Sequence, residues 1–267
     1  MNDREIQSGY AEVNGLNMYY EIWGQGKPLV LIHGGGSTIQ TTFGNLIPEL
    51  SSSRQIIAMD LQAHGRTGDR SNDLSFEQDA SDIVELLHFL KCSKADFFGY
   101  SNGGHTLIEI ALRYPSIVDK MIIASAFYKR SAAPAQFWEG FDHATIDVMP
   151  QPLKAGFLKV NNSEQALLNM FNKDVQKMKN FKGWTDQQMG SIEAPTLVIN
   201  SSEDVGSIEH AVEMYRTIPR GQLVVLPGKH GAYIGAIEFL NNGKWKQRYI
   251  VDIINDFLDE DTTRPIG

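Results

Sequence analysis

Two patterns of apolar residues alternate along most of the chain. Short, continuously apolar runs are typical of strands buried on both faces of a parallel sheet, and they occur at residues 28–32, 55–59, 95–98, 121–126, 195–199 and 223–226. Between them, apolar residues recur at helical spacing, which predicts helices over about 41–50, 76–90, 103–114, 208–218 and 250–258. This alternation indicates βαβ units and a mostly parallel sheet, so the predicted fold class is α/β.

The chain begins with a different pattern. Residues 9–23 alternate between polar and apolar positions, and Asn14-Gly15 lies in the middle of them. Asn-Gly between two β-like runs is typical of a tight β-hairpin. We therefore expect an antiparallel pair of strands ahead of the parallel ones.

The alternation stops between residues 128 and 191. This stretch has no strand pattern and is rich in Phe, Trp, Met and Lys, which predicts several short helices inserted between two strands. We divide the chain accordingly into an α/β core, residues 1–127 and 192–267, and a helical lid, residues 128–191. The lid carries 8 basic and 6 acidic residues, a net +2, which weakly suggests tolerance of a carboxylate on the substrate. A purely structural helical excursion would give the same pattern.

Charge and cysteine content limit the partners. The 267-residue chain has a net charge of −8, which argues against nucleic acid or an anionic membrane as its main partner. Its single cysteine, Cys92, excludes an intramolecular disulfide. The polar N-terminus and the lack of a run of transmembrane length lead us to expect a cytoplasmic protein, monomeric or homodimeric, that acts on small molecules.

The clearest chemical motif is Gly99-x-Ser101-x-Gly103. It lies between the run 95–98 and the helix predicted from residue 103, with almost no connecting residues. Such an abrupt strand-to-helix turn forces its apex into a strained conformation, and flanking glycines relieve the crowding because they have no Cβ. Ser101 at the apex is then exposed and is our candidate nucleophile. A glycine-rich turn with a solvated serine is the alternative interpretation.

A serine hydroxyl is a weak nucleophile and needs a base and an acid that orients the base. Among seven histidines, His230 follows the last predicted strand in a loop, at the sheet edge where α/β proteins place function. Asp204 follows the strand 195–199 and is our candidate acid, with Glu203 as the alternative. The order Ser101, Asp204, His230 is the one associated with a nucleophile elbow.

The intermediate of acyl transfer also needs N–H donors for its oxyanion. We expect one from Asn102, at the start of the helix, and one from the loop His33-Gly34-Gly35-Gly36, with Gly35 the first candidate and Gly36 the second. The chain has no GK[ST] or GxGxxG motif, so we expect no nucleotide, and we expect no metal or other cofactor. An apolar substrate pocket is predicted from Gly36, Tyr100, Phe127, Trp138 and Phe141.

These motifs resemble the α/β-hydrolase fold superfamily over nearly the whole chain. The matching pieces are residues 33–36, Asp60-Leu-Gln-Ala-His-Gly65, residues 99–104, Asp204 and Leu-Pro-Gly-Lys-His230. The resemblance implies a mostly parallel eight-stranded sheet flanked by helices, with the lid after the sixth strand. The subgroup resembled holds small esterases, enol-lactone hydrolases, valacyclovir-hydrolase-like proteins, C–C bond hydrolases and cofactor-free haloperoxidases. Gln62-Ala63 and Thr67 depart from the usual Arg-Gly and Ser. Asn102 is neutral where valacyclovir-hydrolase-like members can have an Asp that holds a substrate ammonium, so the resemblance does not extend to aminoacyl-ester specificity.

The leading hypothesis is a serine hydrolase that cleaves a small carboxylic ester or lactone through an acyl-enzyme on Ser101. A C–C bond hydrolase, a cofactor-free haloperoxidase or perhydrolase, and an acyltransferase would use the same residues. A hydrolase-fold receptor for a small molecule, with little turnover, is the alternative outside the enzymes. Fold and triad are shared by many chemistries, so the sequence does not identify the acyl or alcohol group.

Overall fold

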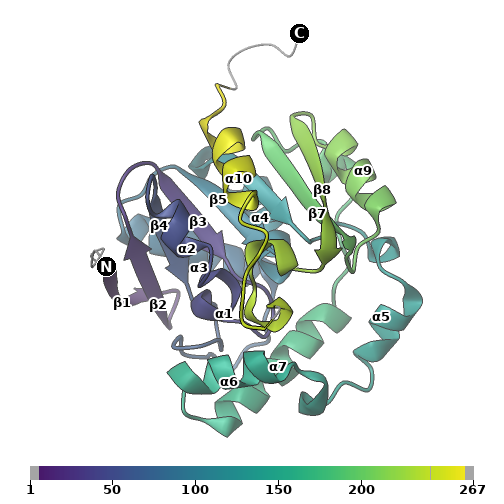
Figure 1. Cartoon of the computed structure of the whole chain (residues 1–267). Helices are drawn as coiled ribbons and strands as arrows, with labels where there is room; N and C mark the ends of the chain where they lie inside the picture. Colours follow the sequence, from purple (N-terminus) through teal and green to yellow (C-terminus); the bar gives the residue numbers. More distant parts are fainter. Residues whose placement is uncertain (1–5, 241, 262–267) are drawn as a thin grey trace.

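One mixed sheet runs through the centre of the molecule (Figure 1). The computed structural model describes residues 6–240 and 242–261, and within them eight strands pair in the order β1-β2-β4-β3-β5-β6-β7-β8. The pairs β1–β2 and β2–β4 are antiparallel and the others are parallel, which confirms the predicted sheet. The strands are β1 (Ile6–Val13), β2 (Leu16–Trp23), β3 (Pro28–Ile32), β4 (Gln55–Met59), β5 (Ala95–Tyr100), β6 (Val118–Ala124), β7 (Thr196–Glu203) and β8 (Gly221–Lys229).

The predicted hairpin is present at the start of the sheet. Asn14 and Gly15 both have positive φ, 48° and 73°, and they connect Val13 to its partner Leu16. Two consecutive left-handed residues are the requirement of a type I′ turn, which Asn-Gly meets at little cost. The turn fixes the register of β1 on β2.

Helices cover both faces of the sheet. One face, which includes Phe97, is covered by α3 (Phe76–Phe89), α4 (Asn102–Arg113) and α9 (Ile208–Thr217). The other face, which includes Phe98, is covered by α1 (Ile39–Phe43), α2 (Ile47–Leu50) and α10 (Ile250–Asp259). The single helix predicted over 41–50 is wrong. Gly44 ends α1, and Pro48 lies in the first turn of α2, where its missing N–H costs nothing.

Residues 128–191, here called the inserted segment, join β6 to β7 through helices alone, and the structure describes this stretch in full. Its helices lie below the sheet in Figure 1. Apolar side chains of α6 and α7, including Leu153, Phe157 and Met170, form a small core of their own. The division into a core and a lid domain stays a prediction. The helices are α5 (Ala135–Gly140), α6 (Gln151–Val160), α7 (Glu164–Lys179) and α8 (Asp186–Met189).

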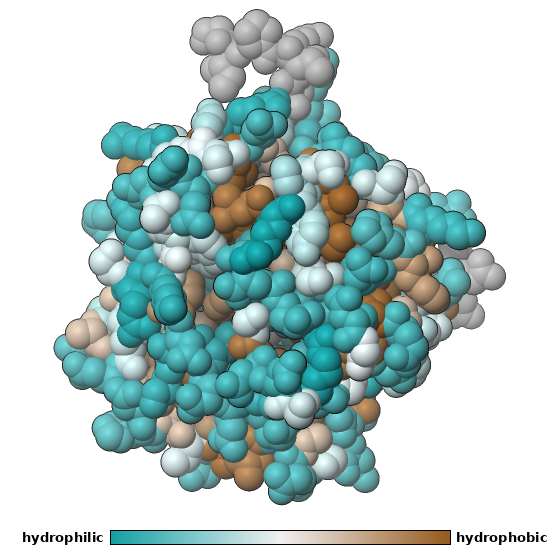
Figure 2. All heavy atoms as spheres, turned by 180° about the vertical axis from the view of Figure 1, so that it is seen from behind, coloured by the Kyte–Doolittle hydropathy of each residue, from teal (hydrophilic) through white to brown (hydrophobic). Residues whose placement is uncertain are grey.

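None of the helices in the described ranges is both long and apolar enough to span a bilayer. The face seen in Figure 2 is mostly hydrophilic, and its hydrophobic residues lie in small, separate groups. That face therefore lacks the large continuous apolar patch that is typical of docking surfaces.

The turn from β5 into α4 is closely packed on both sides. A Cβ on Gly103 would overlap the carbonyl oxygen of Ile32 in β3, and a Cβ on Gly104 would lie 2.6 Å from the Cβ of Ala126. Real Cβ atoms do not approach backbone or side chains this closely, so α4 can sit against β3 and β6 only with glycine here.

We predict that Gly103→Ala destabilises the protein because the new methyl group must push α4 away from β3. Overpacking of this kind costs roughly 1–3 kcal/mol, which for a domain of this size lowers the unfolding midpoint by about 2–12 °C. Gly140→Ala is the matched control, because a Cβ there has no neighbour within 4 Å. Equal melting temperatures for the two variants, measured by circular dichroism, would contradict the packing argument.

Candidate active site

Ser101 occupies the apex of the turn between β5 and α4. Its backbone angles, φ 53° and ψ −121°, lie in a region that non-glycine residues rarely adopt. This conformation turns its hydroxyl out of the strand and toward the loop after β8. The Ser101 Oγ lies 3.2 Å from the Nε2 of His230.

His230 lies between Ser101 and Asp204. Its Nδ1 is 2.5 Å from Oδ1 of Asp204. An ionised carboxylate only accepts hydrogen bonds, so the neutral imidazole carries its proton on Nδ1 and leaves Nε2 to accept from the Ser101 hydroxyl. The geometry therefore brings together the three residues that the sequence singled out, in the arrangement of nucleophile, base and acid.

Asp204 is fixed by several donors at the end of β7. Its Oδ2 accepts from the Ser201 N–H at 3.0 Å, the Ser201 hydroxyl at 2.8 Å and the Ser125 hydroxyl at 2.6 Å. Burial would raise the pKa of this carboxyl. The hydrogen bond and charge of His230, together with the hydrogen bonds from Ser125 and Ser201, outweigh burial and lower the pKa to about 2. Glu203, the alternative acid, is exposed and pairs in the sheet with Lys229.

The two proposed oxyanion donors lie next to Ser101. Asn102 begins α4, and a Cβ on Gly35 would lie 2.5 Å from the Asn102 side-chain amide, so the two residues are in direct contact. Within the described ranges neither backbone N–H has a hydrogen-bond partner. Gly36, the second candidate, is different because its N–H donates to Oδ2 of Asp174 at 2.6 Å. Its N–H is therefore already occupied.

A cavity of about 430 Å³ opens beside Ser101 and His230. Three predicted pocket residues line it, namely Gly36, Phe127 and Phe141. The prediction was wrong for Tyr100, which is buried with its ring 5.1 Å from that of His230. It was also wrong for Trp138, which stacks on Phe181 at 5.7 Å and is covered by Arg130. The remaining walls come mainly from apolar residues of the inserted segment: Phe137, Val148, Met149, Pro150, Leu153, Phe171, Val175 and Met178.

Sequence reasoning missed Asp174 and Ser125, which also line the cavity. Asp174 was only one of the charges counted in the inserted segment, and nothing in helical spacing shows that its side chain reaches another loop. Ser125 follows β6 and has φ 51°, so its backbone is strained like that of Ser101. The residues after β6 include no carboxylate, so the sequence gave no reason to expect that Ser125 helps to orient Asp204.

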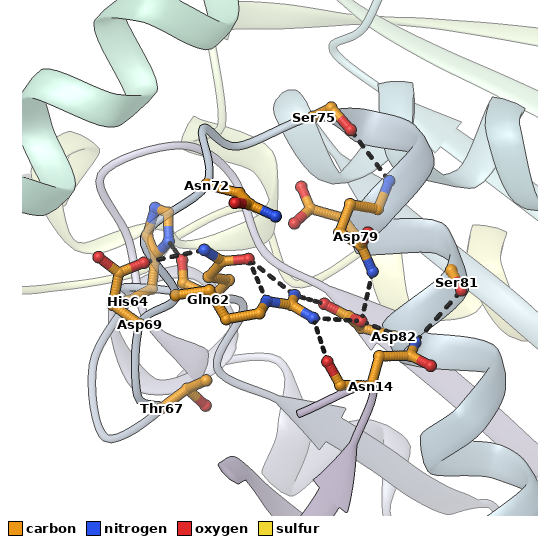
Figure 3. Close-up of polar contacts among 12 residues, drawn as sticks. Asn14, Gln62, His64, Thr67, Asp69, Asn72, Ser75, Asp79, Ser81 and Asp82 are labelled. Atoms are coloured by element: carbon orange, nitrogen blue, oxygen red, sulfur yellow. Dashed lines mark hydrogen bonds and ion pairs between the residues drawn. The ribbon is translucent and has the colours of Figure 1, made fainter. Parts of the chain in front are cut away.

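The loop after β4 carries His64, whose Nε2 lies 2.9 Å from Oδ2 of Asp174. Figure 3 shows hydrogen bonds and an ion pair that connect this loop to α3 and to the β1–β2 turn. Arg70 contributes most of these contacts, because it pairs with Asp82 and donates to the Gln62 side chain and to the Asn14 carbonyl. The partner of Asp174 is thereby held on a rigid loop.

Two other histidines near the site hold backbone in place with their rings. His33 accepts from the Leu61 N–H at 3.0 Å and His105 from the Phe127 N–H at 3.4 Å. Burial lowers the pKa of each to about 3, so both are neutral at physiological pH. No group of three or more possible metal-binding side chains occurs in residues 6–240 and 242–261.

Comparison with known proteins agrees with this geometry. Residues 27–154 match the family model described as alpha/beta hydrolase fold. The chain has the α/β-hydrolase fold. It is 27% identical to a pyrrolizixenacetamide deacetylase from Xenorhabdus hominickii, covering 84% of this chain and 91% of the relative.

Two further proteins to which the chain is similar are also named hydrolases. The human serine hydrolase BPHL is 26% identical, covering 86% of this chain and 82% of BPHL. The structure of 2-hydroxy-6-oxo-6-phenylhexa-2,4-dienoate hydrolase from a Rhodococcus species superposes with a TM-score of 0.78 at 15% identity, covering 96% of this chain and all of that one. The structural likeness shows the fold alone.

We predict that Ser125→Ala weakens the site without unfolding it. The variant removes one charge-assisted hydrogen bond from Asp204, while both Ser201 donors remain, so kcat should fall about tenfold with little change in KM. The pKa of Asp204 should rise. An ionised Asp204 stabilises the fold above about pH 4, and that contribution disappears as the pH falls toward its folded pKa of about 2. In Ser125→Ala the loss should therefore start at the same pH, which the unfolded-state pKa sets, but it should be smaller and should be complete at a higher pH than in wild type.

Ser202→Ala is the matched control, because the Ser202 hydroxyl accepts from the Gly228 N–H at 3.1 Å and does not touch Asp204. Acid-unfolding curves and steady-state kinetics are measured for both variants. If the two behave alike, Ser125 does not act through Asp204.

Proposed function

We propose that this α/β hydrolase cleaves a small carboxylic ester or lactone through an acyl-enzyme on Ser101. The observation that carries the proposal is the continuous contact from Ser101 Oγ through His230 to Asp204, at 3.2 and 2.5 Å, beside an open apolar cavity. The relatives whose names state hydrolase or deacetylase activity support the reaction class.

In the proposed reaction, Ser101 Oγ attacks the substrate carbonyl while its proton passes to Nε2 of His230. Asp204 stabilises the resulting imidazolium, because it keeps its negative charge. The N–H groups of Gly35 and Asn102 receive the developing oxyanion, and His230 then returns the proton to the leaving oxygen. Water enters, and the same groups hydrolyse the acyl-enzyme.

The inserted segment would act as a lid over this reaction. Its apolar side chains form most of the cavity wall, which suits the binding of an apolar acyl group and the exclusion of bulk water. The same triad would also serve C–C bond cleavage, perhydrolysis, acyl transfer or a receptor with little turnover. No specific observation in the cavity favours one of these over ester hydrolysis.

The nucleophile is tested with a fluorophosphonate probe and a set of p-nitrophenyl esters of graded chain length. We expect wild-type protein to be labelled and to turn over, and Ser101→Ala to lose labelling and about 10⁴-fold or more in kcat. Labelling without turnover of any ester would support a receptor. A Ser101→Ala protein that is still labelled, or that keeps most of its activity, would overturn the assignment.

The acid is tested by Asp204→Asn. The amide fills the same space but cannot hold the Nδ1–H tautomer of His230, so kcat should fall by about 10⁴ while the fold is retained. Glu203→Gln is the control, and it should stay within about threefold of wild type because its side chain is exposed. A larger effect for Glu203→Gln would show that the wrong carboxylate has been chosen.

A further inference from the structure

The charged side chains that line the cavity beside Ser101 are of one sign. Of the described residues that line it, Asp174 is the one carboxylate, and no lysine or arginine is among them. The two imidazoles in the wall are His230 and His105. The rest of the lining is apolar or uncharged. Any charge on a bound acyl group would therefore meet Asp174 without a facing lysine or arginine.

The basic residues of the inserted segment do not change this. Lys173 pairs with Asp69 at 2.8 Å, Lys179 pairs with Asp142 at 3.1 Å, and Lys129 pairs with Asp186 at 2.7 Å, all outside the cavity. No basic side chain of the segment, which the structure describes in full, lines the cavity, so the net positive charge that suggested tolerance of a substrate carboxylate lies outside it. The structure thus removes the ground for that expectation.

Asp174 is ionised and held in place. Its Oδ2 accepts from the Gly36 N–H at 2.6 Å and lies 2.9 Å from His64 Nε2, and its Oδ1 lies 3.5 Å from the Lys177 ammonium. Burial would raise the pKa of this carboxyl, but His64 and Lys177 outweigh it and hold the pKa well below its usual range. The side chain cannot easily become neutral to admit a second anion.

The one buried ammonium nearby has a closer partner. Lys177 pairs with Asp79 at 3.1 Å, so two carboxylates share it. Burial would lower the pKa of His64, but Asp174 outweighs burial and raises it. His64 therefore already compensates part of the negative charge of Asp174. This cluster leaves no unshared cation for an anionic ligand.

The position of Asp174 makes its charge matter for the acyl group. A Cβ on Gly35 would lie 3.2 Å from the Asp174 Oδ2, so the carboxylate is adjacent to a proposed oxyanion donor. On the same helix, Phe171, Val175 and Met178 form an apolar wall of the cavity. An acyl carboxylate bound here would lose its hydration and face a like charge at short range.

We propose that Asp174 is a specificity-determining residue, and that the site takes acyl groups without a negative charge and rejects those that carry a carboxylate. This inference rests on the proposed hydrolysis at Ser101. It separates this chain from hydrolases whose substrates carry a carboxylate on the acyl side, and it leaves uncharged apolar acyl groups as the substrate class.

The test compares two esters of the same shape: the mono-p-nitrophenyl ester of adipic acid and its terminal carboxamide. Background hydrolysis is taken from Ser101→Ala. We expect wild type to favour the amide by at least about tenfold in kcat/KM, because like charges in a poorly solvated site repel strongly. Asp174→Asn should move this ratio toward unity by about tenfold, even if it slows both reactions through its contact with Gly36.

Matched variants separate charge from folding. Asp69→Asn makes the same chemical change in another acid that pairs with a lysine of the inserted segment, but outside the cavity, and should leave the ratio unchanged. Val148 lies at the cavity mouth and is 67% exposed, so a charge there should be tolerated. Val148→Lys should improve the anionic ester relative to the amide, and Val148→Glu should do the opposite.

The outcomes are distinct. Wild-type protein that hydrolyses both esters equally well overturns the inference and leaves the proposed function standing. A preference for the amide that neither Asp174→Asn nor the two Val148 variants alter assigns selectivity to shape and likewise overturns it. If neither ester turns over and the fluorophosphonate probe does not label Ser101, the proposed function itself fails.

Discussion

The backbone at Ser101 is left-handed, and the rest of the site depends on how this strain is held. β5 can turn directly into α4 only because residues 99 and 103 are glycines. A Cβ on Gly99 would overlap the carbonyl of Gly103, and a Cβ on Gly103 would overlap the carbonyl of Ile32. The close packing of α4 against β3 leaves no room for the turn to relax. The same turn aims the Ser101 hydroxyl at His230 and presents the first N–H groups of α4 beside it.

A second set of contacts ties the inserted segment to this centre. Asp174 reaches from α7 to the Gly36 N–H, to His64 on the loop after β4 and, through Lys177, to Asp79 on α3. Ionised groups buried this way stay in place because separating any pair would leave an uncompensated charge. One carboxylate thus holds the loop of residues 33–36, the loop after β4 and α7 together.

Local patterns were sufficient for most of the fold. The buried strands, the Asn14-Gly15 hairpin and the glycine-flanked Ser101 each follow from short-range sterics or from hydrophobic period, so sequence alone predicts them. The pairing of His230 with Asp204 followed from the rule that strand ends meet at one sheet edge. Tyr100 and Trp138 were misplaced because an aromatic residue near a site can equally well pack behind it. Asp174 could not be found, since its contacts span from α7 to residues 36 and 64, and no local pattern records such a meeting.

The most direct measurement is the intact mass of the protein during turnover of a p-nitrophenyl ester, followed by peptide mapping. The account predicts a transient gain equal to the acyl group, located on Ser101 and absent from Ser101→Ala, with more of it accumulating when deacylation is slowed. Hydrolysis with no acyl adduct, or with the adduct on another residue, would contradict the role assigned to Ser101.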